Sequence, residues 1–326
     1  MSRVTNVLIL AALTLAWQAP AIAQSKTDGY KADPGKSVAG KQAPAPPARV
    51  IPRFTPAPAI WRVADADTTI YLFGTIHLLD PALEWRSPRL EAVIAEAGEL
   101  VVEAAETDTA KLEPALAKML LADLEIERPP LLDRVPEAAR PALREAIAAA
   151  GFAPAMFDRM PTWMAVFMLG YAGAGMGEAT SEAGADASLE ARFVAAGKPV
   201  RSIEDPMAVI ESIRALPEAA VVALLVDTPA PVAAPEAGAE AGVDDIAWAR
   251  GDIDGLAADL SEEALGAPLY DALIRRRNAA WTGWVQKRLE IPGTVLIAVG
   301  AGHLVGRDSL QTMLAARGVE ARRLDR

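Results

Sequence analysis

The only two histidines of this 326-residue chain, His77 and His303, each end a Gly-x-x-His tetrapeptide. The first tetrapeptide begins at Gly74 and the second at Gly300. Glycine fills 23 of 326 positions, so two histidines would both follow a glycine at this spacing only about one time in 200 by chance. Imidazole is the side chain most used for metal binding and for proton transfer near neutral pH. The sequence therefore predicts that the two histidines are halves of one site, whose glycines permit a close backbone approach.

Any transition-metal site in this chain must also use carboxylates, because the chain has no cysteine. Glu103 is the best candidate, since it ends a short apolar run where an unpaired carboxylate would be costly. Two histidines and one carboxylate form a known hydrolytic ligand set that leaves positions for water. Such an ion lowers the pKa of bound water and polarises a carbonyl. We therefore predict His77, Glu103 and His303 as catalytic residues and metal ligands; the simpler alternative is a Glu103 that ends its strand in solvent.

Two charged residues lie on helix faces that are otherwise apolar. Arg277 shares a stripe with Leu269, Leu273, Trp281 and Val285, and Asp186 falls in line with Leu189 and Phe193. A charge on a core-facing stripe usually has a partner or a ligand. We expect Arg277 to contact a carboxylate, with Asp186 as the first choice and Glu204 as the second. A guanidinium that holds a substrate carboxylate is the alternative.

Both tetrapeptides follow strand-like apolar runs, at 69–73 and 294–299. Alternation and turn residues predict a hairpin of strands 59–63 and 68–73 and further strands at 99–103, 198–203 and 319–323. Capping residues and periodicity predict helices at 88–98, 182–196, 268–289 and 308–316. The resulting fold class is α/β (α+β), in which the N- and C-terminal segments build a central mixed sheet and a large helical insert lies between them.

The N-terminus has the pattern of a secretory signal peptide over residues 1–23. Arg3 precedes an apolar stretch at 7–17 that is too short to span a bilayer, and Ala21-Ile-Ala23 fits the cleavage rule. The sequence thus predicts a periplasmic or secreted protein, and an uncleaved membrane anchor is the alternative. Residues 24–53 form a basic linker rich in Pro, Ala and Lys that could make a weak contact with the envelope.

The predicted mature body covers residues 54–326, with the helical insert at about 109–267 and a flexible loop at 228–242. No later stretch reaches 18 uninterrupted apolar residues, so we expect no transmembrane segment in the mature protein. The chain carries a formal net charge of −11. A strongly acidic protein is unsuited to nucleic acid, whose binding needs a basic face.

Short motifs extend from the first tetrapeptide to the second: Gly74-Thr-Ile-His77-Leu, Val101-Val-Glu103, Gly184-Ala-Asp186, Lys198-Pro-Val200, Ile203-Glu204, Trp248 with Gly251-Asp252, Arg277-Asn278 and Val299-Gly-Ala-Gly-His303-Leu with Gly306. Together they resemble the TraB/GumN family, whose eukaryotic branch includes the Tiki proteases. The resemblance covers roughly residues 60–323.

The resemblance implies an erythromycin-esterase/ChaN-like fold and metal-dependent peptide-bond hydrolysis. It carries His77, Glu103 and His303 over as metal and catalytic residues and implies Mn or Co as the divalent ion. The residues themselves leave Zn open as well. Its motifs also include Asn278, which we expect, like Arg277 and Asp186, to support the ligands or to contact the substrate.

Two functional classes follow from these observations. The first is a metal-dependent hydrolase of the bacterial envelope that cleaves a peptide or another acyl bond with an activated water. The second is a non-catalytic periplasmic protein that binds a metal, haem or polymer and is associated with exopolysaccharide production. A Ser-His-Asp triad is the weakest alternative, because no Gly-x-Ser-x-Gly motif is present.

Overall fold

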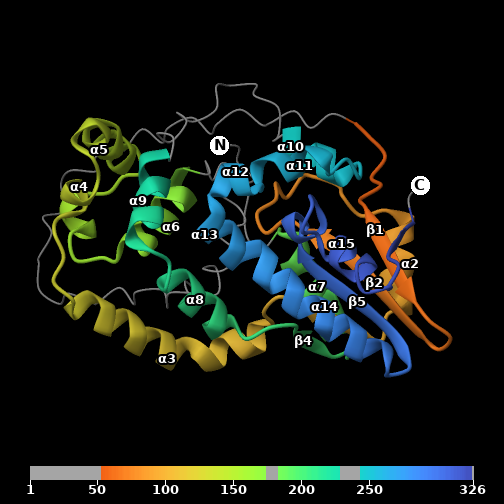
Figure 1. Ribbon diagram of the computed structural model, residues 1–326. Helices are drawn as coiled ribbons and strands as arrows, with labels where there is room; N and C mark the ends of the chain where they lie inside the picture. Colours follow the sequence, from red (N-terminus) through yellow and green to blue (C-terminus); the bar gives the residue numbers. More distant parts are fainter. Residues whose placement is uncertain (1–52, 174–182, 228–242, 325–326) are drawn as a thin grey trace, which may run out of the picture.

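A six-stranded mixed sheet forms the centre of the protein in a computed structural model, which describes residues 53–173, 183–227 and 243–324. The strand order is β4-β3-β5-β2-β1-β6. The strands are β1 (Ile60–Ala64), β2 (Thr68–Thr75), β3 (Glu99–Val102), β4 (Val200–Ser202), β5 (Gly293–Gly300) and β6 (Arg322–Arg323). Figure 1 shows this sheet on one side of the molecule and a group of helices on the other. The predicted α/β fold is confirmed.

The strands β4, β3, β5 and β2 run parallel to one another, whereas β1 is antiparallel to both β2 and β6. The predicted hairpin of β1 and β2 is confirmed. Strand β5 is buried along most of its length, as expected of a parallel strand covered on both faces. All four parallel strands therefore end at the same edge of the sheet.

Four helices contribute buried residues to the core of the sheet: α2 (Pro88–Glu96), α7 (Ala185–Ala195), α14 (Arg276–Leu289) and α15 (Leu310–Ala315). Helix α2 begins as predicted, because the Ser87 side chain accepts from the Leu90 amide and Pro88 occupies the first turn. Its C-terminal carbonyls receive hydrogen bonds from Lys198 Nζ, which ties α2 to the start of β4. Helix α14 lies in front of the sheet in Figure 1.

The remaining helices are α3 (Glu106–Glu125), α4 (Leu131–Arg134), α5 (Arg140–Ala149), α6 (Thr162–Gly173), α8 (Pro206–Arg214), α9 (Glu218–Asp227), α10 (Val243–Ala249), α11 (Asp254–Asp259), α12 (Glu262–Leu265) and α13 (Ala267–Tyr270). Most of α3–α6, α8 and α9 surround a second apolar core, away from the sheet. Helix α7 and the segment 246–260 pack instead into the core of the sheet. The sequence between β3 and α14 thus contributes to two cores, and its division into domains stays a prediction.

Two predicted elements differ from the observed ones. The helix expected at 268–289 is interrupted by a π-helical turn, η3 (Asp271–Arg275), between α13 and α14. This turn buries Leu273 and Ile274 in the second core, while α14 continues toward the sheet. The terminal strand expected at 319–323 is reduced to the two residues of β6, because Val319 and Ala321 pack against the sheet core before the chain pairs with β1.

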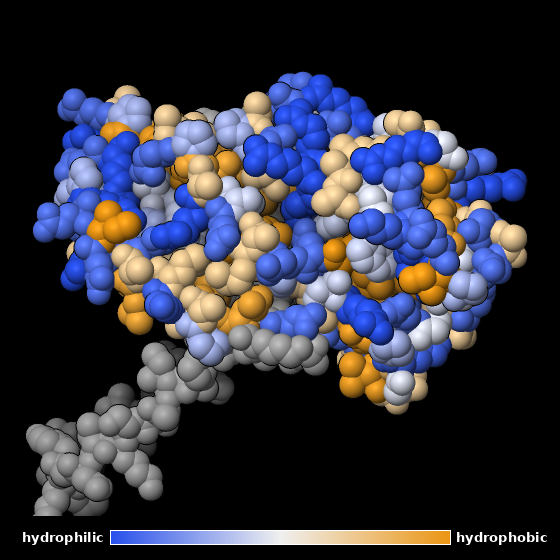
Figure 2. Space-filling model, turned by 60° about the horizontal axis from the view of Figure 1, so that its bottom comes forward, coloured by the Kyte–Doolittle hydropathy of each residue, from blue (hydrophilic) through white to orange (hydrophobic). Residues whose placement is uncertain are grey.

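Within the described ranges, no helix is both long enough and apolar enough to cross a membrane. Figure 2 shows one face of the molecule, where apolar residues form separate patches between hydrophilic ones. Exposed hydrophobic residues scattered in this way are normal and need no partner to explain them. The predicted signal peptide, nearly all of the linker and the loop at 228–242 lie outside the described residues.

Candidate functional site

Four candidate residues follow the ends of four neighbouring parallel strands. They are Glu204 after β4, Glu103 after β3, His303 after β5 and His77 after β2. Ligand sites of open parallel sheets lie at the carboxyl ends of the strands. The topology thus brings together residues that are far apart in the sequence, as the paired Gly-x-x-His motifs predict.

The glycines of the two motifs have different structural roles. A Cβ on Gly74 would lie 2.9 Å from Ala301 Cα, so the two strand-end corners pack backbone against backbone. Trp248 strengthens this contact, since its indole N–H donates to the Gly74 carbonyl at 2.8 Å. The Gly300 amide instead donates to Glu103 Oε1 at 2.7 Å. This bond orients the Glu103 carboxylate at the end of β3.

Arg277 of α14 lies at the centre of the candidate site. Its Nη2 donates to Glu103 Oε2 at 2.5 Å and also to Glu204 Oε1, and its Nε lies 3.0 Å from Glu204 Oε2. Its Nη1 donates to the Leu273 carbonyl at 3.2 Å and lies 3.0 Å from His303 Nε2. The Arg277 side chain is 9% exposed, so the predicted inward face of this helix is confirmed.

Asp186 pairs with His77 and not with Arg277. Its Oδ2 lies 2.9 Å from His77 Nδ1. The Ala185 amide donates to the Ile76 carbonyl at 2.9 Å, which holds the first turn of α7 beside the first motif. Our first choice of partner for Arg277 was therefore wrong, and the second, Glu204, is confirmed.

Asn278 sets the tautomer of His303. The Asn278 amide nitrogen donates to the carbonyls of His303 and Asp308 at 3.1 and 2.8 Å, so its oxygen must face His303 Nδ1, 2.8 Å away. An amide oxygen only accepts, hence Nδ1 of His303 carries the proton. In the neutral ring, Nε2 is then the unprotonated nitrogen, and it accepts from Arg277 Nη1.

The two histidines have opposite pKa shifts. Burial and the positive charge of Arg277 lower the pKa of His303 to about 3, so this ring is neutral. Burial also acts to lower the pKa of His77, but the charge and hydrogen bond of Asp186, with help from Glu103, outweigh it and raise the pKa to about 9. His77 is therefore an imidazolium at neutral pH.

The two glutamates differ because they share one guanidinium. Burial acts to raise the pKa of Glu103, but the charges of Arg277 and the histidines hold it well below its usual range. Burial raises the pKa of Glu204, and its bonds to Arg277 offset this only in part. Glu103 is thus the carboxylate whose charge is fixed most firmly.

Several buried polar atoms near the first motif have no hydrogen-bond partner within the described part of the chain. They are Thr75 Oγ1, His77 Nε2, Asp80 Oδ2 and Asp186 Oδ1. Buried polar groups are nearly always bonded to protein or water. An ordered water or a ligand is therefore expected next to the His77–Asp186 pair.

The residues proposed as metal ligands do not fit an ion in this arrangement. Across residues 53–173, 183–227 and 243–324, no three histidine, aspartate or glutamate side chains are grouped as a metal ion requires. Glu103 and His303 both bond to Arg277, and the unpartnered Nε2 of His77 carries a proton in the imidazolium, so it offers no lone pair to an ion. The divalent ion stays a prediction from the sequence, and no chemical step below depends on it.

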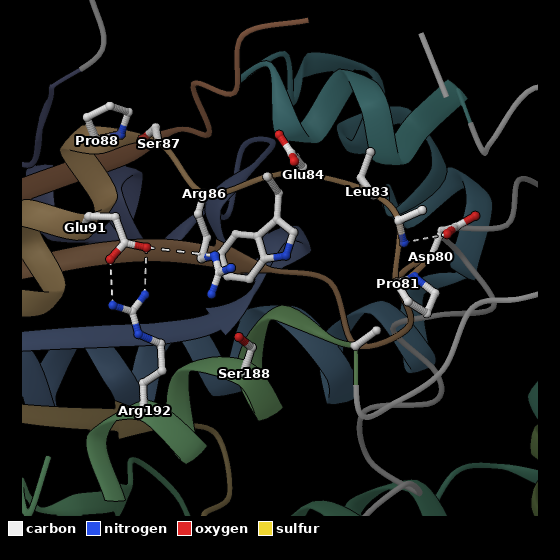
Figure 3. Close-up of a pocket in the computed structure, with 13 residues that line it drawn as sticks. Asp80, Pro81, Leu83, Glu84, Arg86, Ser87, Pro88, Glu91, Ser188 and Arg192 are labelled. Atoms are coloured by element: carbon white, nitrogen blue, oxygen red, sulfur yellow. Dashed lines mark hydrogen bonds and ion pairs between the residues drawn. The ribbon is translucent and has the colours of Figure 1, made fainter. Parts of the chain in front are cut away.

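Figure 3 shows a cleft whose lining residues are close in the sequence to His77 and to Asp186. Its walls are residues 80–88 and 91, which follow His77 in the chain, and Ala183, Ser188 and Arg192, which flank Asp186. Arg192 forms two parallel hydrogen bonds to Glu91, at 2.7 and 2.6 Å, across one end of the cleft. The volume of the cleft is about 1120 Å³, which exceeds the roughly 300–1,000 Å³ of typical small-molecule sites.

Trp281 is a residue of the site that the sequence reasoning treated only as part of an apolar stripe. Its indole N–H donates to Glu204 Oε2 at 3.1 Å, its ring lies 4.9 Å from the Arg277 guanidinium, and it packs against His303 at 4.3 Å between ring centroids. Its position one helical turn after Arg277 is a signal that could have suggested this role.

Comparison with known protein families shows to which family the chain belongs. No curated protein and no solved structure matches it. A sequence model of the TraB/PrgY/gumN family matches residues 59–323, which include every strand of the sheet and every residue of the candidate site. The chain therefore belongs to the TraB/PrgY/gumN family.

Proposed function

We propose that this protein is a hydrolase of the bacterial envelope that cleaves peptide or other acyl bonds with water as the nucleophile. The observation that carries the proposal is the buried His77–Asp186 pair, in which His77 Nε2 and Asp186 Oδ1 have no hydrogen-bond partner among the residues that the structure describes. A histidine that is oriented by a carboxylate and keeps its second nitrogen free is the arrangement that proton-transfer catalysis needs.

The charge states suggest a role for each member of the pair. His77, with its pKa raised to about 9, can donate a proton from Nε2 to the departing amine or alkoxide. Asp186 keeps its free Oδ1 as an acceptor for a proton of the attacking water. Desolvation strengthens both interactions, because the site is buried and its effective dielectric constant is low.

The remaining site residues act on this pair through their charges and do not take part in proton transfer. Glu103 supports the positive charge of His77, and Arg277 fixes Glu103. The cleft supports a substrate larger than a typical metabolite, which favours a peptide or a polymer carrying acyl groups.

The proposal is tested with the purified chain, a mixture of fluorogenic peptides and a series of aryl esters. We expect the wild type to cleave at least one class, and His77→Gln and Asp186→Ala to lose about 100-fold or more of that activity, as removal of general acid–base catalysis typically does. Arg307→Met is a matched control, because Arg307 is 62% exposed and lies outside the His77–Asp186 pair.

Circular dichroism and thermal melts of each variant separate loss of activity from loss of fold. A wild type that binds these substrates without cleaving any of them would favour the non-catalytic binding protein. Full activity in folded His77→Gln would contradict the assignment of proton transfer to this histidine.

A further inference from the structure

Glu103 and His303 face a cation that belongs to the protein itself. Arg277 Nη2 lies 2.5 Å from Glu103 Oε2, and Nη1 lies 3.0 Å from His303 Nε2. We propose that the Arg277 guanidinium permanently occupies the position between Glu103 and His303 that a divalent ion would take, so that no divalent ion binds between these two side chains. The inference concerns occupancy of the site and does not depend on the hydrolase proposal.

The hydrogen bonds of Arg277 account for every donor that it has. A guanidinium carries five N–H groups. The partners of these groups are Glu204 for Nε, the Leu273 carbonyl and His303 Nε2 for Nη1, and Glu103 and Glu204 for Nη2. No donor remains for a substrate, so Arg277 is a positioning residue.

The lone pair that His303 would offer to a metal is already in use. Asn278 holds the proton on Nδ1, which leaves Nε2 as the acceptor, and this atom points at Arg277 Nη1. Rotation of the ring would break the bond to Asn278, and Trp281 packs against one face of the ring at 4.3 Å. His303 therefore cannot turn toward an ion without losing both contacts.

Both carboxylate oxygens of Glu103 also have hydrogen-bond donors within the protein. Its Oε1 accepts from the Gly300 amide at 2.7 Å while its Oε2 accepts from Arg277. An ion entering between Glu103 and His303 would place a second positive charge beside a buried guanidinium. It could bind only if Arg277 left, and Arg277 is anchored by Glu204 and by the Trp281 ring.

The first test is a titration of the full chain, freed of metal with a chelator, with Co²⁺ and Zn²⁺. Because the chain has only two histidines, nitrogen-15 labelling of histidine gives one set of ring signals for each. We expect the His303 signals to keep the Nδ1–H pattern and to stay unshifted after addition of either ion. Binding of one equivalent with a shift of His303 Nε2, lost in His303→Ala, would overturn the proposal.

The second test removes the resident cation. Arg277→Ala frees Glu103 and His303, and we expect this variant to bind Co²⁺ at least tenfold more tightly than the wild type, an affinity that Arg277→Ala/His303→Ala loses. Arg307→Ala is the matched control and should bind no more Co²⁺ than the wild type. A folded Arg277→Ala protein without this gain would show that Arg277 does not exclude the ion. If the variant fails to fold, the wild-type titration decides.

Discussion

Replacing Arg277 with methionine should lower the free energy of unfolding by about 3–5 kcal/mol, because breaking a buried ion pair leaves its partner charge without compensation. Two carboxylates lose their cation in this variant, since Arg277 bonds to both Glu103 and Glu204. Their side chains are only 9% and 14% exposed, so water cannot replace the guanidinium. Methionine keeps much of the apolar volume of the arginine side chain, which limits the contribution from an empty cavity.

Thermal melts measure this effect. In a domain of 150–250 residues, 1 kcal/mol corresponds to roughly 2–4 °C in Tm. Taking the lower value for this larger body, 3–5 kcal/mol becomes a loss of roughly 6–10 °C. The control, Arg307→Met, breaks ion pairs of an arginine that is 62% exposed, and because exposed ion pairs contribute little to stability, its Tm should stay close to that of the wild type. A Tm for Arg277→Met within the range of the control would refute the buried network.

A double-variant cycle tests which carboxylate is the partner. The effects of Arg277→Met and Glu204→Gln should be strongly non-additive, because the residues are in direct contact. Asp186→Asn should be closer to additive with Arg277→Met, since Asp186 bonds to His77. A larger coupling to Asp186 than to Glu204 would restore the pairing first expected from the helix pattern.

Two further predictions concern the first motif. Gly74→Ala should destabilise the fold by about 1–3 kcal/mol, as overpacking does, because the new Cβ would meet Ala301 Cα at 2.9 Å; in urea unfolding, Gly283→Ala in α14 is the control and should be neutral or stabilising, since its nearest neighbour is 3.8 Å away. The raised pKa of His77 contributes stability that is complete below about pH 6.5 and is lost as the pH rises through about 9. Asp186→Asn should flatten this part of the stability–pH curve, and an unchanged curve would show that the pair does not set the pKa.

The convergence of the two motifs could be predicted from the sequence because strand ends are local features. An apolar run followed by Gly-x-x-His places each histidine at the end of a strand, and parallel strands align such ends at one edge of a sheet. The inward direction of Arg277 could also be predicted from the local sequence, since helix periodicity determines which face of the helix is buried. The partner of Arg277 could not be predicted in this way, because it depends on how α7 and β4 approach α14 in the folded protein.

The π-helical turn before α14 also could not be predicted from the sequence pattern. The apolar stripe of residues 268–289 repeats every four residues, which is close to the 3.6-residue repeat of an α-helix, and all of its members are buried. The turn arises because Asp271–Arg275 must pack into the second core, while α14 presents Arg277 to the sheet. π-Helical turns are rare and occur mostly as single turns inside α-helices, often at functional sites, and the position of this one follows from tertiary packing.

The two Gly-x-x-His motifs are alike in sequence and opposite in chemistry. A carboxylate beside His77 raises its pKa to about 9, whereas a guanidinium beside His303 contributes to lowering its pKa to about 3. When the surroundings of two titratable groups shift their pKa values in opposite directions, the two groups can take different roles within one site, as acid, base or positioning residue. His77 has the free nitrogen and the charge needed to transfer a proton, and His303 has neither. The two motifs therefore have different roles in spite of their similar sequences, and these roles are set by Asp186 and Arg277, which come from other elements of the fold.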